Sequence, residues 1–408
     1  MPDTREKSPK KRKTGSEYTL PSRSGGFRSE IDLVQPSESS LPGSGRLSPS
    51  KQFHLWRLQP GGIDYGDLSC FADKPRSLRR LLGRIGQVME GFAIISTTQR
   101  DEILQAAESC DDEFDWAVAG SHYFSAERDA LGTTPSVSAV LDILDNAAEC
   151  NTHGHHEDAW NKAVHTPVLA LAFHQDGKRI KNQLITSASC IHASIMPEYG
   201  TSGMSKKVDF CVYINPQNDS PPKTSSPVAD AIGRIVHQLP GKVFNFTDFE
   251  PIQMRPIALS IETKKPTEGF DVAKLQLGVW QMAHWAFLKT LISIQQTNER
   301  QRQVVEQQDR DPPGDADDML MGQPAQASPP HQDRASSTQH DDRLRTQFEL
   351  PEFLPGIIIN GHNWWFTVTS FDGSRVKFWE KAAIGSTDNT RDIYKLEFQE
   401  AIESINIK

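Results

Sequence analysis

Between residues 51 and 150, apolar positions recur three and four residues apart, a spacing that places them on one face of a helix. The pattern predicts helices over Ser77–Val88, Thr98–Ala117 and Ser136–Cys150. A further helix is predicted from about His155. Pro167 should end or kink it, because proline lacks the N–H of a helical hydrogen bond and its ring crowds the preceding turn.

The pattern then changes to short runs typical of strands. Three strands are predicted, over Gln183–Ser189, Lys207–Ile214 and Pro256–Thr263. The second alternates apolar and more polar residues with the period of 2 that puts them on opposite faces of a sheet. Two helices are predicted afterwards, a short one over Val228–Leu239 and a long one from Phe270 to about Ile294.

The C-terminal region reads as three more strands and a helix. They are predicted over Gly356–Asn360, Trp364–Phe371, Arg375–Glu380 and Thr390–Ile405. Asp372-Gly373 lies between two aromatic, β-rich runs and predicts a hairpin turn. Helices that precede and follow strands in this order predict an α/β fold, with a mixed central sheet flanked by helices.

Two segments are predicted to be disordered. Residues 1–50 are rich in Ser and poor in large apolar side chains, so they bury too little to offset the entropy of ordering. Residues 297–346 form a polar, Pro-containing stretch too long for an ordinary loop. We therefore expect one domain over residues 51–408, with a helical part at 51–150 and a core at 151–296 and 347–408, interrupted by the insertion.

The overall charge limits the classes of partner. A formal net charge of −9 and a pI of about 5.8 exclude a uniformly basic surface, so any contact with nucleic acid must be local. No run of 18 apolar residues is present, which argues against a membrane-spanning helix, and the N-terminus lacks the apolar region of a signal peptide. Five widely spaced cysteines fit reduced thiols in an intracellular protein better than a disulfide framework.

A short basic cluster, Pro9-Lys10-Lys11-Arg12-Lys13, lies in the predicted tail. Exposed Lys and Arg flanked by Pro and Ser are typical of a nuclear-import signal, so we expect a nuclear protein with an import receptor as one partner. A solvated charge run or a weak nucleic-acid contact are the alternatives.

Ionisable residues occur where strands are otherwise apolar. Asp209 lies in the second predicted strand, and Glu262 and Lys264 alternate at the end of the third, on one face, with Thr263 on the other. Because buried charge is costly without partners, we expect a divalent cation there, with Asp209 and Glu262 as oxygen ligands suited to Mg²⁺. Lys264 would position an attacking water and offset phosphate charge. The alternative is a buried ion pair between Asp209 and Lys264.

These residues resemble the PD-(D/E)xK nuclease superfamily, in which an acid on one strand is followed by Glu/Asp-x-Lys on the next. Here Asp209 is followed by Glu262-Thr263-Lys264, and Val208 stands in the place of the Pro. Gln276-Leu277-Gly278-Val279-Trp280 resembles the Gln-hydrophobic-x-x-Tyr motif of RecB-like nucleases, with Trp for Tyr. The segment from Glu157 to His165 resembles the first-helix motif. These motifs, together with Gly361-His362-Asn363-Trp364, are similar to those of a fungal group of PD-(D/E)xK nuclease-like proteins.

The resemblance implies a restriction-endonuclease-like core with a mixed four-stranded sheet, and Mg²⁺- or Mn²⁺-dependent hydrolysis of phosphodiester bonds. It implies that Asp209, Glu262 and the Thr263 carbonyl hold the metal, and that Glu157 supports it. It further implies that Lys264 positions the water and that Gln276 orients the substrate or Lys264. The expected partner is nucleic acid, DNA rather than RNA. The alternative is an inactive nuclease-like fold that binds nucleic acid or proteins in the nucleus.

Three other patterns have a chemical and a structural interpretation each. Cys150 with His153, His155 and His156 is either a zinc cluster or a surface loop. The C-terminal aromatics either stack on bases or form sheet core; they are Trp364, Trp365, Phe366, Phe371, Phe378 and Trp379. Five basic residues near the proposed site either contact phosphates or are merely exposed; they are Lys206, Lys207, Arg255, Lys265 and Lys274.

Overall fold

The computed structural model describes residues 48–59, 61–109, 112–131, 134–173, 183–200, 207–221, 224–310 and 349–396. Several predictions concern residues outside these ranges. They are the basic cluster Pro9–Lys13, nearly all of the tail predicted over residues 1–50, residues 311–346 of the predicted insertion, and the end of the helix predicted over Thr390–Ile405.

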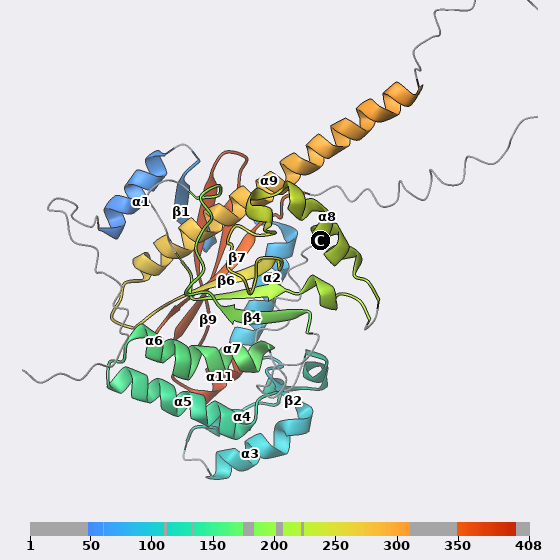
Figure 1. The fold of residues 1–408 in the computed structure, drawn as a ribbon. Coiled ribbons are helices and arrows are strands. Elements are labelled where there is room, and N and C mark those ends of the chain that lie inside the picture. Colours follow the sequence, from blue (N-terminus) through green and yellow to red (C-terminus); the bar gives the residue numbers. More distant parts are fainter. Residues whose placement is uncertain are drawn as a thin grey trace, which may run out of the picture. The chain divides into compact units, whose positions relative to one another are not determined.

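The centre of the structure is a mixed sheet of seven strands, in the order β1-β9-β8-β7-β6-β5-β4 (Figure 1). The strands are β1 (Ile63–Asp67), β4 (Ile185–Ser189), β5 (Phe210–Ile214), β6 (Ile257–Lys264), β7 (Leu354–Asn360), β8 (Asn363–Phe371) and β9 (Val376–Ser386). The pairs β1–β9 and β6–β7 are parallel, and the other neighbours are antiparallel. Two short strands, β2 (Ile95–Ser96) and β3 (Phe124–Ser125), form a separate parallel pair.

Helices cover both faces of the sheet. They are α1 (Pro49–Leu58), α2 (Arg76–Met89), α3 (Arg100–Ser109), α4 (Asp115–Val118), α5 (Val137–Thr152), α6 (Glu157–Trp160), α7 (Thr166–Phe173), α8 (Pro227–Ile235), α9 (Phe270–Arg310) and α11 (Thr390–Lys395). Apolar residues of α2, α5, α7 and α11 pack into one hydrophobic cluster, and those of α9 pack into a second cluster. The expected α/β fold with a mixed central sheet between helices is confirmed.

Strand β6 lies in the middle of the sheet and is buried along its whole length. Burial on both faces explains why its sequence is almost continuously apolar until Glu262. Its parallel neighbour β7 pairs Asn360 with Lys264, so the carboxyl ends of these two strands lie together. The charged residues of β6 therefore lie at the carboxyl end of a buried interior strand.

The C-terminal strands complete the sheet begun before residue 311, as the sequence predicts. The expected turn joins β8 to β9: the Asp372 carboxylate accepts hydrogen bonds from the N–H groups of Ser374 and Arg375. Gly373 has φ of +93°, a conformation that glycine adopts without steric cost. The resemblance implied four strands, whereas β1, β8 and β9 widen the sheet beyond that core.

Two predictions for the N-terminal part need correction. The helix expected over Thr98–Ala117 is divided into α3 and α4, because Phe114 is fully buried with φ of −117°, outside the helical region. The expectation of a mostly helical part at 51–150 missed β1, a short strand with the polar sequence Ile-Asp-Tyr-Gly-Asp at the sheet edge.

Two helices continue further than predicted. Helix α9 reaches Arg310, so residues 297–310 of the predicted disordered insertion are helical. That segment contains no Gly or Pro, and because it is polar on all sides it carries no amphipathic signal. The helix that contains Pro167 does not end there. A π-helical turn, η5 (Asn161–His165), precedes α7, and Pro167 lies in α7 directly after this turn, where the hydrogen-bonding pattern of the helix changes.

None of the helices in the described ranges has the length and apolar character needed to span a bilayer. Cys70, Cys150, Cys190 and Cys211 fall within the described ranges, and all four are free thiols.

Candidate active site

The ammonium group of Lys264 is the centre of the candidate site. Its Nζ lies 2.6 Å from Glu262 Oε1, 3.0 Å from Glu157 Oε2 and 2.6 Å from the carbonyl oxygen of Thr263. The side chains of Lys264 and Glu262 are 5% and 1% exposed. Strand β6 supplies Glu262 and Lys264, and the first turn of α6 supplies Glu157 across the end of the sheet.

Asp209 joins the site from the beginning of β5. Its Oδ2 accepts a hydrogen bond from the Thr263 N–H at 2.8 Å and another from the Thr263 hydroxyl at 2.9 Å. The register pairs Phe210 with Ile261, so Asp209 lies next to Glu262 across the strand pair. The strand predicted from Lys207 begins only at Phe210, and Asp209, just before it, directs its carboxylate to the N–H and hydroxyl of Thr263 on β6.

A chain of polar side chains supports Asp209 from behind. The Thr263 hydroxyl lies 2.8 Å from Asn161 Oδ1, which is 2.9 Å from Nδ1 of His165, and Nε2 of His165 lies 3.2 Å from the Gly361 carbonyl oxygen. Asn161 and His165 begin and end the π-helical turn, a feature that often marks functional sites. These two positioning residues are not among the site residues that the sequence predicts, although both lie in the first-helix motif.

Burial governs the electrostatics of the carboxyl groups. It raises the pKa of Glu262 well above its usual value, and repulsion from Asp209 adds to the rise while Lys264 opposes it. Burial also raises the pKa of Asp209 against the hydrogen bonds from Thr263, and that of Glu157 against the attraction of Lys264. Negative charge exceeds positive charge at the site.

Burial by itself lowers the pKa of Lys264, but the attraction of Glu262, Glu157 and Asp209 outweighs it and holds that pKa above its usual value. The ammonium therefore stays protonated at neutral pH.

The residues fit a divalent cation. Glu262 Oε2 is buried and, among the described residues, has no hydrogen-bond partner, so this carboxylate oxygen is available for a further positive charge. The two hydrogen bonds that the Asp209 carboxylate accepts from Thr263 both go to Oδ2. Hard carboxylate oxygens are the ligands that Mg²⁺ takes in proteins. The Thr263 carbonyl, expected as a ligand, accepts a hydrogen bond from Lys264 in this structure.

The structure brings together Glu157, Asp209, Glu262, Thr263 and Lys264. Gln276 is half-buried on α9, and within the described part of the chain it forms no hydrogen bond to that group. The alternative of an ion pair between Asp209 and Lys264 does not describe the site, since the ion pairs of Lys264 are with Glu262 and Glu157.

The remaining candidates mostly serve the fold. Trp364, Phe366 and Phe378 are buried in the two hydrophobic clusters, which favours the sheet-core interpretation of the C-terminal aromatics. Lys274 is paired with Glu380 and Asp271, and Lys265 with Glu268.

Arg255 bonds to the Pro251 carbonyl, and Lys207 is half-buried, whereas Lys206 lies outside the described residues.

The fold and this site define a class of protein. A sequence model of the PD-(D/E)XK nuclease superfamily matches residues 103–397, which is well over half of the chain. The chain belongs to this superfamily, whose members are generally nucleases. A search of curated proteins found no match.

Proposed function

We propose that the protein is a nuclear, metal-dependent nuclease that hydrolyses phosphodiester bonds, in DNA rather than RNA. The observation that carries the proposal is the buried Glu262–Lys264 pair, with the partly exposed Glu157 as a second partner of the ammonium, Asp209 beside Glu262, and Glu262 Oε2 unpartnered among the described residues. Such a cluster is costly for folding, and a bound cation would offset its negative charge.

In this proposal Asp209 and Glu262 hold the cation, Glu157 supports it, and the Thr263 carbonyl becomes available when Lys264 moves from it. Mg²⁺ or Mn²⁺ would supply a Lewis acid that polarises the scissile phosphate and lowers the pKa of a bound water. Lys264 stays protonated, so it donates hydrogen bonds that orient the water and offset phosphate charge, and it does not accept the proton. Asn161 and His165 keep Thr263 and Asp209 in place.

Helix α2 offers a surface for the nucleic-acid backbone. It carries exposed Arg76, Arg79, Arg80 and Arg84 and no acidic residue. Its buried residues belong to the same hydrophobic cluster as Trp160 and Val164 of the segment that follows Glu157. Helix α2 therefore packs on the same side of the sheet as the segment that follows Glu157, with its arginines exposed to solvent. These arginines supply a local positive charge that the acidic chain lacks overall.

The inactive alternative has one observation in its favour. The three hydrogen bonds of the Lys264 ammonium all go to protein groups, which are Glu157, Glu262 and the Thr263 carbonyl. If this arrangement persists when metal and nucleic acid are present, the protein binds nucleic acid or a protein partner without cutting.

The test is cleavage of supercoiled plasmid, linear duplex, single-stranded DNA and RNA by purified protein with Mg²⁺, Mn²⁺ or EDTA. We expect cleavage that depends on the metal. Lys264→Met should lower the rate about 10²–10³-fold, the usual effect of removing a preorganised electrostatic group. Asp209→Asn should weaken metal affinity, so that a higher Mg²⁺ concentration partly restores its activity.

The matched control is Lys265→Met. Lys265 is the next residue, and its partner Glu268 lies at the surface, so this variant should cut like the natural protein. Full activity of both Lys264→Met and Asp209→Asn would place the active site elsewhere. Binding without cleavage under every metal condition would favour the inactive alternative.

A further inference from the structure

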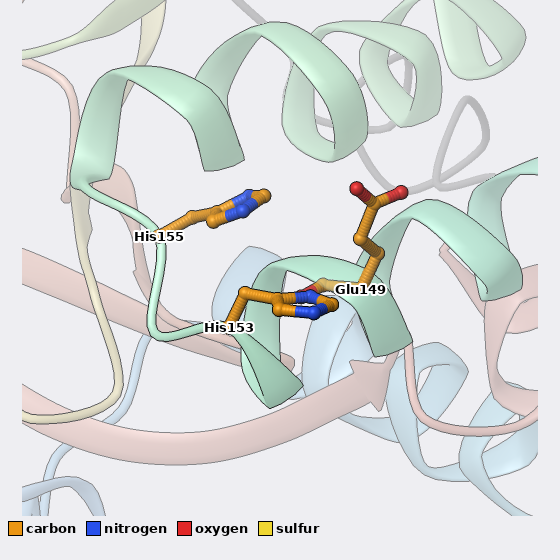
Figure 2. A group of neighbouring side chains, drawn as sticks. All are labelled: Glu149, His153 and His155. Carbon is orange, nitrogen blue, oxygen red and sulfur yellow. The ribbon is translucent and has the colours of Figure 1, made fainter.

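Three metal-ligating side chains meet at the C-terminal end of α5, outside the candidate active site. Figure 2 shows Glu149, His153 and His155 with their polar ends grouped around one space. One ligand atom from each residue lies within 4.8 Å of the other two. Glu149 lies in the last turn of α5 and His153, four residues later, is the residue that caps the helix, so both side chains stand on the same side of the helix end.

The backbone that follows α5 holds His155 over the helix end. The N–H of His155 donates to the Cys150 carbonyl at 2.9 Å, and the N–H of Gly154 donates to the Asn151 carbonyl at 3.2 Å. Gly154 has φ of +59°, the left-handed conformation that commonly ends helices. The two imidazole rings are consequently stacked, with centroids 5.8 Å apart and an interplanar angle of 27°.

One histidine is also oriented for metal binding. Nδ1 of His153 lies 3.1 Å from the backbone carbonyl of Glu149, a hydrogen bond that requires the proton on Nδ1. The other nitrogen, Nε2, then carries the lone pair. Histidines that ligate metals usually donate their second N–H to a carbonyl or carboxylate in this way, which fixes the tautomer and the ring orientation.

We propose that Glu149, His153 and His155 bind one Zn²⁺ ion. Two imidazoles and a carboxylate form a ligand set of zinc sites, whereas Mg²⁺ prefers oxygen ligands alone. At Zn–N distances of about 2.0–2.1 Å, tetrahedral ligand atoms stand roughly 3.3 Å apart. Glu149 and His153 are exposed and His155 half-buried, so small rotations of their side chains bring the atoms, which already lie within 4.8 Å of one another, to that separation. A fourth position remains for water.

This ligand set differs from the zinc cluster that was one of the two interpretations of the sequence. Cys150 is 2% exposed and packs in the hydrophobic cluster of α5, and burial raises the pKa of its thiol, so it supplies no ligand. His156 is exposed and lies outside the group. Glu149, which the motif did not include, takes the place of the thiol because it lies one helical turn before His153.

Zinc at this position would tie the end of α5 to the loop before α6. His155 lies two residues before Glu157, so the ion would also restrict where α6 begins. An effect of zinc on catalysis through the position of Glu157 rests on the proposed function, whereas zinc binding itself does not.

The test is titration of the full chain with Zn²⁺ against a chelating dye, and with Co²⁺ followed by visible absorption. All titrations use the Asp209→Asn variant in excess Mg²⁺, and the other substitutions are made in it, so that the carboxylates of the candidate active site do not contribute to the zinc signal. We expect one equivalent of Zn²⁺ and a Co²⁺ spectrum of tetrahedral intensity. His153→Ala, His155→Ala and Glu149→Gln should each lower the affinity by more than about tenfold, since even outer partners of metal sites cost that much.

His156→Ala is the matched control, because it removes a neighbouring exposed histidine of the same loop. It should leave both signals unchanged. Circular dichroism of every variant confirms that the fold is retained. Absence of zinc binding, or an equal loss in His156→Ala, would overturn the proposal whether or not the protein is a nuclease.

Discussion

Glu262 combines nearly complete burial with a carboxylate oxygen that has no hydrogen-bond partner among the described residues. Its negative charge adds to those of Asp209 and Glu157, and only Lys264 opposes them in this group. Such an arrangement opposes folding in the absence of a cation, because each buried charge has lost its hydration. The site therefore lowers the stability of the fold when no cation is bound.

A neutral isostere should reverse that cost. We expect Glu262→Gln to unfold at a higher temperature than the natural protein in EDTA, with a gain of about 1–3 kcal/mol, since the change removes the desolvation cost of this charge and its repulsion from Asp209 and Glu157, while Lys264 keeps Glu157 as an ion-pair partner. Lys264 keeps its bonds to Glu157 and the Thr263 carbonyl. Thermal unfolding with EDTA measures the change, and cleavage should be lost. A lower unfolding temperature in EDTA would contradict this account.

His284 should make stability depend on pH. It lies on α9, stacked on Phe246 with ring centroids 4.8 Å apart, and burial lowers its pKa to about 3. The unfolded chain protonates a histidine near pH 6.5, so below that pH the unfolded state binds a proton that the native state does not. The free energy of unfolding should therefore fall with falling pH between about 6.5 and 3, by about 1.4 kcal/mol per pH unit.

His284→Phe should remove this contribution, because phenylalanine keeps a flat ring against Phe246 and has no proton to gain. Urea unfolding at several pH values between 7 and 5 compares the two proteins. The raised pKa values of Glu157, Asp209 and Glu262 act in the opposite direction, but they are common to both proteins and cancel in the difference. Parallel pH profiles for the two proteins would contradict the prediction.

At the residue scale, the sequence indicated the charged residues of the candidate site but not Asn161 and His165, which support Thr263 and Asp209. Glu157, Asp209 and Glu262 carry charges whose burial demands partners, so their type and order identify them. Asn161 and His165 are neutral, and their role depends on the π-helical turn and on the approach of Gly361 from the end of β7. Those interactions span 196 residues in the case of His165 and Gly361, and local patterns do not show them.

At the scale of elements, α2 illustrates how one helix meets two requirements. Leu78, Leu81 and Ile85 pack in the hydrophobic cluster, and arginines occupy the exposed face. We expect the triple variant Arg76→Gln, Arg79→Gln and Arg80→Gln to bind duplex DNA more weakly. The dependence of log K on log salt should become shallower by about 0.9 for each phosphate that the variant no longer neutralises.

Fluorescence anisotropy of labelled DNA at several KCl concentrations, in EDTA to prevent cutting, measures both quantities. Arg234→Gln is the control, since Arg234 is an exposed arginine on a different helix, α8. An unchanged salt dependence in the triple variant would show that α2 does not bind the phosphates.

The elements that the sequence predicted well are those with one dominant signal. Strand β6 is apolar because it is buried on both faces, and α5 has apolar residues at helical spacing after the capping Ser136. The end of α9 and strand β1 were missed because neither has an apolar pattern. The first is stabilised by helix propensity and the second by pairing with β9, a strand more than 300 residues away.

At the scale of the whole molecule, positive charge gathers at several places in this acidic chain, among them the exposed face of α2 and the cluster Lys10-Lys11-Arg12-Lys13. The second lies far in the sequence from the described residues, which begin at Ser48. We therefore assign the two different tasks: contact with nucleic acid for the first and nuclear import for the second, because import receptors bind short exposed runs of Lys and Arg.

Replacing Lys10, Lys11, Arg12 and Lys13 by Ala should abolish nuclear accumulation of the protein fused to a fluorescent tag large enough to block passive entry. The substituted residues precede all elements of the sheet, so the purified variant should retain its cleavage and zinc binding. The matched control, Lys10→Arg, Lys11→Arg and Lys13→Arg, preserves the charge and should remain nuclear, because the receptor reads cationic side chains. An unchanged distribution of the alanine variant would show that another segment directs the protein.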